Sequence, residues 1–186
     1  VSYVGTIGLT HGVGVVVEAA KTLKNVIPGL VFLLVGDGYE KDGLERKTRN
    51  EGLTNILFLG RQPREKIPLL INLSDISLVL SGSNPILGKT IFAKVFEPMA
   101  CGKPIIVGAE GETKQLVVDK GKAGISIAPE SGGELIEAIK TLYNNAELRK
   151  KLGDNGRQFV TSEYSRKKKA NDYIQILESI KIRHRA

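Results

Sequence analysis

The segment NILFLGRQPREKIPLLINLSDISLVLS, residues 55–81, places two apolar runs on either side of a helical pattern. The runs at 56–59 and 76–80 are apolar with little interruption, which is typical of strands that a sheet buries on both faces. Pro63 opens the helical pattern at 64–74, since proline suits the start of a helix. A strand, a helix and a second strand at this spacing predict a right-handed parallel crossover.

The same alternation continues over most of the chain. We expect further strands at 1–7, 31–35, 104–107 and 124–127, and further helices at about 12–25, 40–51, 93–100 and 112–119. Beyond Pro129 the pattern is helical. We therefore predict an α/β fold with a doubly wound, six-stranded parallel sheet of the Rossmann-like type over 1–164, followed by a basic C-terminal helix at 165–186.

The composition is that of one soluble globular domain. The chain has 186 residues, of which 41% are hydrophobic and 25% are charged. It contains neither an apolar run long enough to span a membrane nor a signal-peptide pattern. Cys101 is the only cysteine, so an internal disulfide is excluded and a reducing compartment is favoured. We expect a cytoplasmic protein, with peripheral contact at the inner face of the cell membrane as an alternative.

The chain begins with V-S-Y-V-G, inside an expected strand and without an initiator methionine. We therefore expect it to be a piece of a longer chain.

The net charge of +7 comes entirely from the C-terminal part. Residues 1–148 hold 16 basic and 16 acidic residues, whereas residues 149–186 hold 11 basic and 4 acidic ones. A solvated helical face explains this excess most simply, and contact with an anionic membrane surface is the alternative. The basic run at 166–169 contains no interleaved aromatic residue for stacking on bases, so we do not expect nucleic acid as a partner.

Glycines mark the ends of several expected strands. They occur at 5–8, 36–38 and 60–61, and a polar loop follows the next strand at 81–90. Parallel α/β sheets bind ligands beyond the carboxyl ends of their strands, where glycine lets a ligand approach the backbone. These segments therefore predict one binding crevice.

Residues for catalysis by a nucleophile are sparse. His11 and His184 lie far apart in the sequence, and no cluster of His, Cys or Asp has metal-ligand spacing. We expect a binding domain without a metal site and without a cofactor.

Seven segments follow one another in a recognisable order. They are YVGTIG (3–8) with HG (11–12) and EAA (18–20), LLVGDG with a later leucine (33–44), the segment 55–81, AKVFEPMACGKPIIVG (93–108), EGETKQLV (110–117), GISIAP (124–129) and LGDNGRQFV (152–160). Together they resemble the C-terminal, donor-binding domain of GT-B glycosyltransferases of family 4, also called group 1. The resemblance extends to about Tyr164, and it is strongest to the branch that acts on bacterial lipid-linked saccharides.

The resemblance gives a role to Glu97. It matches the second glutamate of the E-x7-E motif of this family, whose carboxylate accepts hydrogen bonds from the two ribose hydroxyls of the nucleotide. The first helical turn, with Ala93 and Lys94, would face the diphosphate. The resemblance also places the base against Gly60 and Arg61, with Arg61 a candidate for stacking on the base or binding phosphate.

The sequence departs from the family pattern at two places. The first glutamate of the motif, which contacts the transferred sugar, is replaced by Lys89. The arginine and lysine that neutralise the diphosphate correspond roughly to Thr6 and His11, beside Gly5 and Gly8.

The resemblance implies the donor domain of a retaining, metal-independent glycosyltransferase of the hexosyltransferase type. Such an enzyme moves a sugar from a nucleoside diphosphate, UDP rather than GDP, to a saccharide or lipid-linked acceptor. The acceptor would be held by an N-terminal domain absent from this fragment, so the isolated fragment should be inactive. Two alternatives are a GT-B-fold sugar-nucleotide epimerase and a non-catalytic nucleotide-sugar-binding or scaffold subunit.

Overall fold

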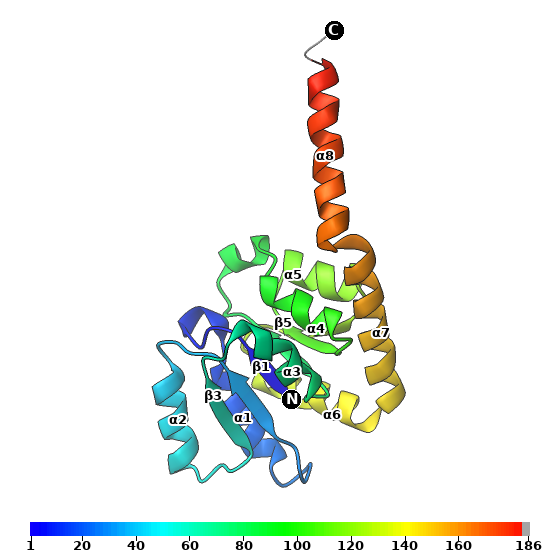
Figure 1. Cartoon of the computed structure of the whole chain (residues 1–186). Coiled ribbons are helices and arrows are strands. Elements are labelled where there is room, and N and C mark those ends of the chain that lie inside the picture. Colours follow the sequence, from blue (N-terminus) through cyan, green and yellow to red (C-terminus); the bar gives the residue numbers. More distant parts are fainter. Residues whose placement is uncertain (184–186) are drawn as a thin grey trace.

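The computed structural model describes residues 1–183 and contains one six-stranded sheet (Figure 1). The strand order is β3-β2-β1-β4-β5-β6, and all neighbouring strands are parallel. This confirms the predicted doubly wound α/β fold. The strands are β1 (Ser2–Val4), β2 (Phe32–Val35), β3 (Ile56–Gly60), β4 (Ser77–Leu80), β5 (Ile105–Gly108) and β6 (Gly124–Ser126).

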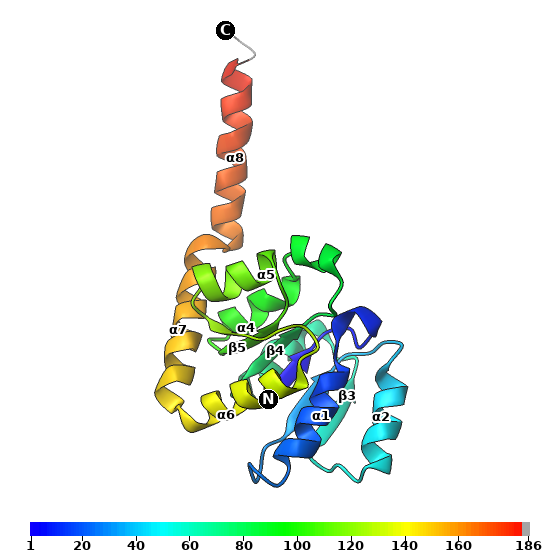
Figure 2. The same ribbon diagram turned by 180° about the vertical axis from the view of Figure 1, so that it is seen from behind.

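Helices cover both faces of the sheet. One face carries α1 (Gly14–Leu23), α2 (Lys41–Asn50) and α6 (Gly132–Asn144), which are seen from the front in Figure 2. The other face carries α3 (Ile67–Asn72), α4 (Phe96–Ala100) and α5 (Glu112–Lys114), and α7 (Ala146–Glu163) packs beside α4. Shorter turns are η1 (Leu9–His11), η2 (Arg64–Lys66), η3 (Pro85–Lys89), η4 (Ala93–Val95) and the π-helical η5 (Gln115–Lys120).

The central strands divide the core into two hydrophobic clusters. Along β5, Ile106 packs with the cluster of α1 and α6, whereas Ile105 and Val107 pack with the cluster beneath α4 and η5. Successive side chains of a strand point to opposite faces, so an apolar run fills both layers. At the sheet edge, Leu57 of β3 is 47% exposed, so the expectation of burial on both faces fails there.

Several predicted segments differ in detail from the structure. β1 ends at Val4 rather than at residue 7, because Gly5 turns the chain with φ of +155°. The loop 81–90 contains the helical turn η3, which Asn84 caps by accepting a hydrogen bond from the amide of Ile86. The helix predicted at 93–100 is divided into η4 and α4.

The last helix, α8 (Arg166–Arg183), projects from the body of the molecule (Figures 1 and 2). Its side chains Tyr173, Ile176, Leu177 and Ile180 are exposed. None of the helices in the described part of the chain is long and apolar enough to cross a membrane. His184 lies outside the described residues.

Candidate functional site

The carboxyl ends of β1, β2 and β3 are joined backbone to backbone. The amide of Gly5 donates to the carbonyl of Val35, and the amide of Gly36 donates to the carbonyl of Gly60, both at 2.9 Å. The amide of Ile7 donates to the carbonyl of Asp37, also at 2.9 Å. These bonds continue the sheet beyond its strands, and they fix the three glycine-marked segments side by side.

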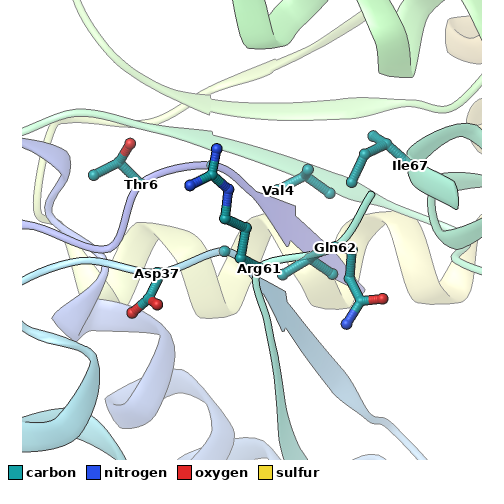
Figure 3. A pocket seen from close by; sticks show the side chains of 9 residues that line it. Val4, Thr6, Asp37, Arg61, Gln62 and Ile67 are labelled. Carbon is teal, nitrogen blue, oxygen red and sulfur yellow. The ribbon is translucent and has the colours of Figure 1, made fainter. Parts of the chain in front are cut away.

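A cavity of about 390 Å³ opens at these strand ends (Figure 3). It brings together four predicted site residues, namely Gly5, Thr6, Gly36 and Arg61. The side chain of Arg61 extends from the end of β3 across the view in Figure 3. The remaining lining residues, which the sequence did not single out as ligand contacts, are Val4, Val35, Asp37, Gln62 and Ile67.

Most of these missed residues had a signal in the sequence. Val4, Val35, Asp37 and Gln62 are chain neighbours of the predicted glycines and of Arg61, so they share the same strand ends. Ile67 had no such signal, because it reaches the cavity from the start of α3 on one face of the sheet.

His11 closes the turn that follows β1. Its amide donates to the carbonyl of Gly8 at 2.8 Å, and its Nδ1 lies 3.3 Å from the hydroxyl of Thr10. Burial and then the nearby charge of Lys94 lower the pKa of His11, and the Gly8 backbone beside the ring raises it more weakly. The imidazole is therefore mostly neutral at pH 7.

Lys94 reaches from η4 to the carboxyl ends of the two central strands. Its Nζ donates to the carbonyl of Leu80 at 2.7 Å and to the hydroxyl of Tyr3 at 3.4 Å. Burial lowers the pKa of Lys94 to about 8. Lys94 lies against the backbone of Gly5, which lines the cavity, whereas Lys94 itself does not line it. Ala93, the preceding residue of η4, is exposed.

Glu97 lies in the first turn of α4 and is partly buried. Its backbone carbonyl accepts a hydrogen bond from the amide of Cys101, so its backbone is fixed by the helix. Glu97 does not line the 390 Å³ cavity. A role of Glu97 at the ribose therefore stays a prediction.

Lys89 ends η3 and is exposed. Part of its loop lines a second cavity of about 410 Å³, together with Glu110, Gly111 and Pro129. The start of this loop is fixed by a hydrogen bond, because the carboxylate of Glu130 accepts from the amide of Ser83 at 3.0 Å. The structure thus keeps Lys89 at the carboxyl edge of the sheet, outside the cavity at β1–β3.

The site is formed by backbone amides, an arginine and a few polar side chains. Over the described residues, no group of three or more His, Cys, Asp and Glu side chains is placed to hold a metal ion. The parallel sheet has the strand order 3-2-1-4-5-6, and the cavity lies beyond the carboxyl ends of β1, β2 and β3. This is the architecture of the Rossmann-like class of α/β domains.

The chain belongs to the family described as glycosyl transferases group 1, whose model matches residues 1–159. Its fold is that of a GT-B C-terminal domain, followed by a further helix. The structure is similar to Anabaena Alr3699/HepE, solved in complex with UDP, with a TM-score of 0.83 and 21% identity over 96% of this chain and 48% of that one.

Two curated relatives are glycosyltransferases. An uncharacterised glycosyltransferase of Methanocaldococcus jannaschii, MJ1178, is 31% identical over 84% of this chain and 42% of its own length. The alpha-D-kanosaminyltransferase of Streptomyces kanamyceticus is 29% identical over 89% of this chain and 42% of its own length. The chain thus spans less than half the length of the curated relatives it matches.

Proposed function

We propose that this chain is the donor-binding domain of a retaining, metal-independent glycosyltransferase. It would bind a nucleoside diphosphate sugar, with UDP favoured over GDP, and the whole protein would transfer the sugar to a saccharide or lipid-linked acceptor. The observation that carries the proposal is the cavity at the carboxyl ends of β1, β2 and β3, where Gly5, Thr6, Gly36 and Arg61 converge.

The cavity offers the chemistry that a diphosphate requires. Glycine backbone allows close approach, and Arg61 is a cation that can bind phosphate in a bidentate manner. In the proposed reaction the bond between the sugar and the diphosphate breaks. An acceptor hydroxyl bonds to the same face of the sugar, and its proton passes to the departing diphosphate. The main task of this domain is then to stabilise the charge on the departing diphosphate.

The choice of UDP as the nucleotide is supported by the structurally similar HepE, which was solved in complex with UDP. Because the motif glutamate is replaced by Lys89, we expect the sugar to meet a cation at that position. An anionic or N-acetylated sugar would suit such a contact.

Calorimetric titration of the chain with UDP, GDP and ADP tests the proposal. We expect one of the three to bind, and Glu97→Gln to weaken its binding about tenfold, because charge-assisted hydrogen bonds to the ribose would be lost. Glu137→Gln is the matched control, since Glu137 lies on α6 and pairs with Lys140 at 2.8 Å. Absence of binding by all three nucleotides to the folded chain would contradict the proposal.

The non-catalytic alternative is kept because of Lys89, which stands where the family has a glutamate. Transfer from a nucleotide sugar by a longer form of the protein, with a candidate acceptor, would exclude it. Nucleotide binding without any transfer by that longer form would favour it.

Peripheral contact with an anionic membrane is proposed for α8. The helix combines the basic run 166–169 with exposed Tyr173, Ile176, Leu177 and Ile180. Such a combination suits the interface of an anionic bilayer. Part of the charge is already paired within the protein, since Lys168 contacts Glu163 and Lys169 contacts Asp172.

A further inference from the structure

One hydrogen-bonded unit joins three segments at the carboxyl edge of the sheet. Lys94 donates to the carbonyl of Leu80, the last residue of β4, and to the hydroxyl of Tyr3 in β1. The Tyr3 hydroxyl in turn donates to the carbonyl of Thr6 at 2.6 Å. The unit therefore connects η4 with the central strands and with the turn that follows β1.

The Tyr3 side chain is fixed and directional. It is fully buried, and burial together with the nearby charge of Glu40 raises the pKa of its hydroxyl, so the group stays protonated as a donor. A methyl group on Gly5 would lie 3.4 Å from this hydroxyl oxygen and 3.5 Å from Cδ of Lys94. The two side chains thus pack directly against the Gly5 backbone.

The wall that they support is part of the cavity. Gly5 and Thr6 both line it, and neither Tyr3 nor Lys94 does. Lys94 stands three residues before Glu97, in the segment that leads into α4. Tyr3 and Lys94 therefore connect the cavity wall with the segment that leads into α4.

The Lys94 ammonium also adds a positive potential behind this wall. Burial alone accounts for its lowered pKa, without an opposing carboxylate. Its Nζ lies 5.0 Å from the centre of the Tyr3 ring and 5.3 Å from that of Phe92. A cation held between two aromatic rings and one carbonyl oxygen, in surroundings of low dielectric, attracts an anion on the other side of the wall.

We propose that Tyr3 and Lys94 are positioning residues for the diphosphate part of a bound nucleotide. They hold the Gly5–Thr6 wall against the segment that carries Glu97, so that phosphates and ribose are bound in one geometry. The inference rests on the proposed function, because it requires a nucleotide at this edge of the sheet. It adds two residues that do not contact the nucleotide and that act by holding the backbone of Gly5 and Thr6 in place.

The test compares UMP with UDP, since only the second phosphate differs between them. Calorimetric Kd values are measured for the unaltered chain, Tyr3→Phe, Lys94→Met and Glu97→Gln. In the unaltered chain, we expect UDP to bind more tightly than UMP. Tyr3→Phe should weaken UDP binding about fivefold, the effect of about one hydrogen bond, and should change UMP binding less than about twofold. Lys94→Met should weaken UDP binding more, because a charge is also lost.

Glu97→Gln separates positioning from a general loss of binding. It should weaken UMP and UDP by the same factor, because the ribose is common to both. Thermal unfolding shows whether each variant is folded, and Tyr3→Phe decides the question alone if Lys94→Met does not fold. If the unaltered chain takes GDP and not UDP, GMP and GDP replace the uridine nucleotides.

The outcomes distinguish this inference from the proposed function. If the unaltered chain binds no nucleoside diphosphate, the proposed function fails and the inference fails with it. If the unaltered chain binds with dependence on Glu97, and Tyr3→Phe keeps the ratio of the UMP and UDP affinities, only the inference is wrong. The proposed function and the inference are both supported if the ratio of the Kd for UMP to the Kd for UDP becomes smaller in Tyr3→Phe and stays unchanged in Glu97→Gln.

Discussion

Gly36 lies so close to Gly5 that a methyl group on Gly36 would sit 1.8 Å from the carbonyl oxygen of Gly5. Gly36 also has φ of +144°, a conformation that residues with a side chain rarely adopt. The turns after β1 and β2 can therefore meet only when position 36 carries no side chain. This contact sets the floor of the cavity at the strand ends.

Gly36→Ala should therefore destabilise the protein by more than about 2 kcal/mol, through backbone strain and the clash with Gly5. Chemical denaturation measures this loss. Gly43→Ala is the matched control, because Gly43 lies within α2 and a methyl group there would meet open space. We expect the control to gain about 0.5–1 kcal/mol. Equal effects of the two substitutions would contradict the close contact.

Arg61→Ala should weaken UDP binding about tenfold, because a charge-assisted hydrogen bond at the cavity would be lost. Arg64→Ala serves as the control, since Arg64 lies on η2 and does not line the cavity. Isothermal calorimetry at constant salt compares the two. Similar affinities of both variants would remove Arg61 from the site.

Lys94 should make the free energy of unfolding depend on pH. Its pKa is about 8 in the folded protein against an ordinary value near 10.5, so between these values the unfolded chain binds more protons. Stability should therefore rise with pH across this window, by up to about 3 kcal/mol. The part of this rise that belongs to Lys94 should be absent in Lys94→Met.

Titrations in urea at pH 7.5, 8.5 and 9.5 measure this difference. Lys103→Met controls for the loss of a lysine, because Lys103 is only partly buried and its Nζ donates to the carbonyl of Asn72 at 3.0 Å. Other groups that titrate in this range, the buried N-terminal amine included, are shared by all three proteins. An equal pH slope in all of them would show that Lys94 is not desolvated.

His11 should make nucleotide binding depend on pH. The imidazole has a lowered pKa in the free protein, and a phosphate nearby would raise it, so binding takes up a proton. The affinity for UDP should thus increase as the pH falls from 7.5 to 5.5. Thr10, the Gly8 carbonyl and the charge of Lys94 surround the ring.

His11→Gln provides the comparison, because a terminal phosphate itself titrates near pH 6. The variant should lose the part of the pH dependence that belongs to the protein. If both proteins show the same profile, His11 does not face the phosphates.

Removal of residues 166–186 should abolish any binding of the chain to vesicles with anionic lipid. Flotation with phosphatidylserine vesicles at low and high salt measures this, and vesicles of phosphatidylcholine alone are the control. We expect binding that weakens as salt is raised. Failure of the complete chain to float at low salt would exclude the membrane contact.

The sequence by itself determined the sheet. Segments such as 55–81 bury apolar strands on both faces and connect them by helices, and only a parallel, doubly wound arrangement satisfies this pattern. It also predicted that Gly5, Thr6, Gly36 and Arg61 share one edge, since strand ends of a parallel sheet meet there. Local pattern and chain order contain all of this information.

Only the tertiary structure shows which side chains pack together at the carboxyl edge of the sheet. Tyr3 and Lys94 are separated by 91 residues, and nothing in either local sequence indicates that a lysine amine reaches a tyrosine hydroxyl. Ile67 likewise enters the cavity only because α3 packs on one face of the sheet. Such contacts depend on how helices pack across strands. The periodicity of apolar side chains predicts which face of an element is buried, but it does not predict which residues that face contacts.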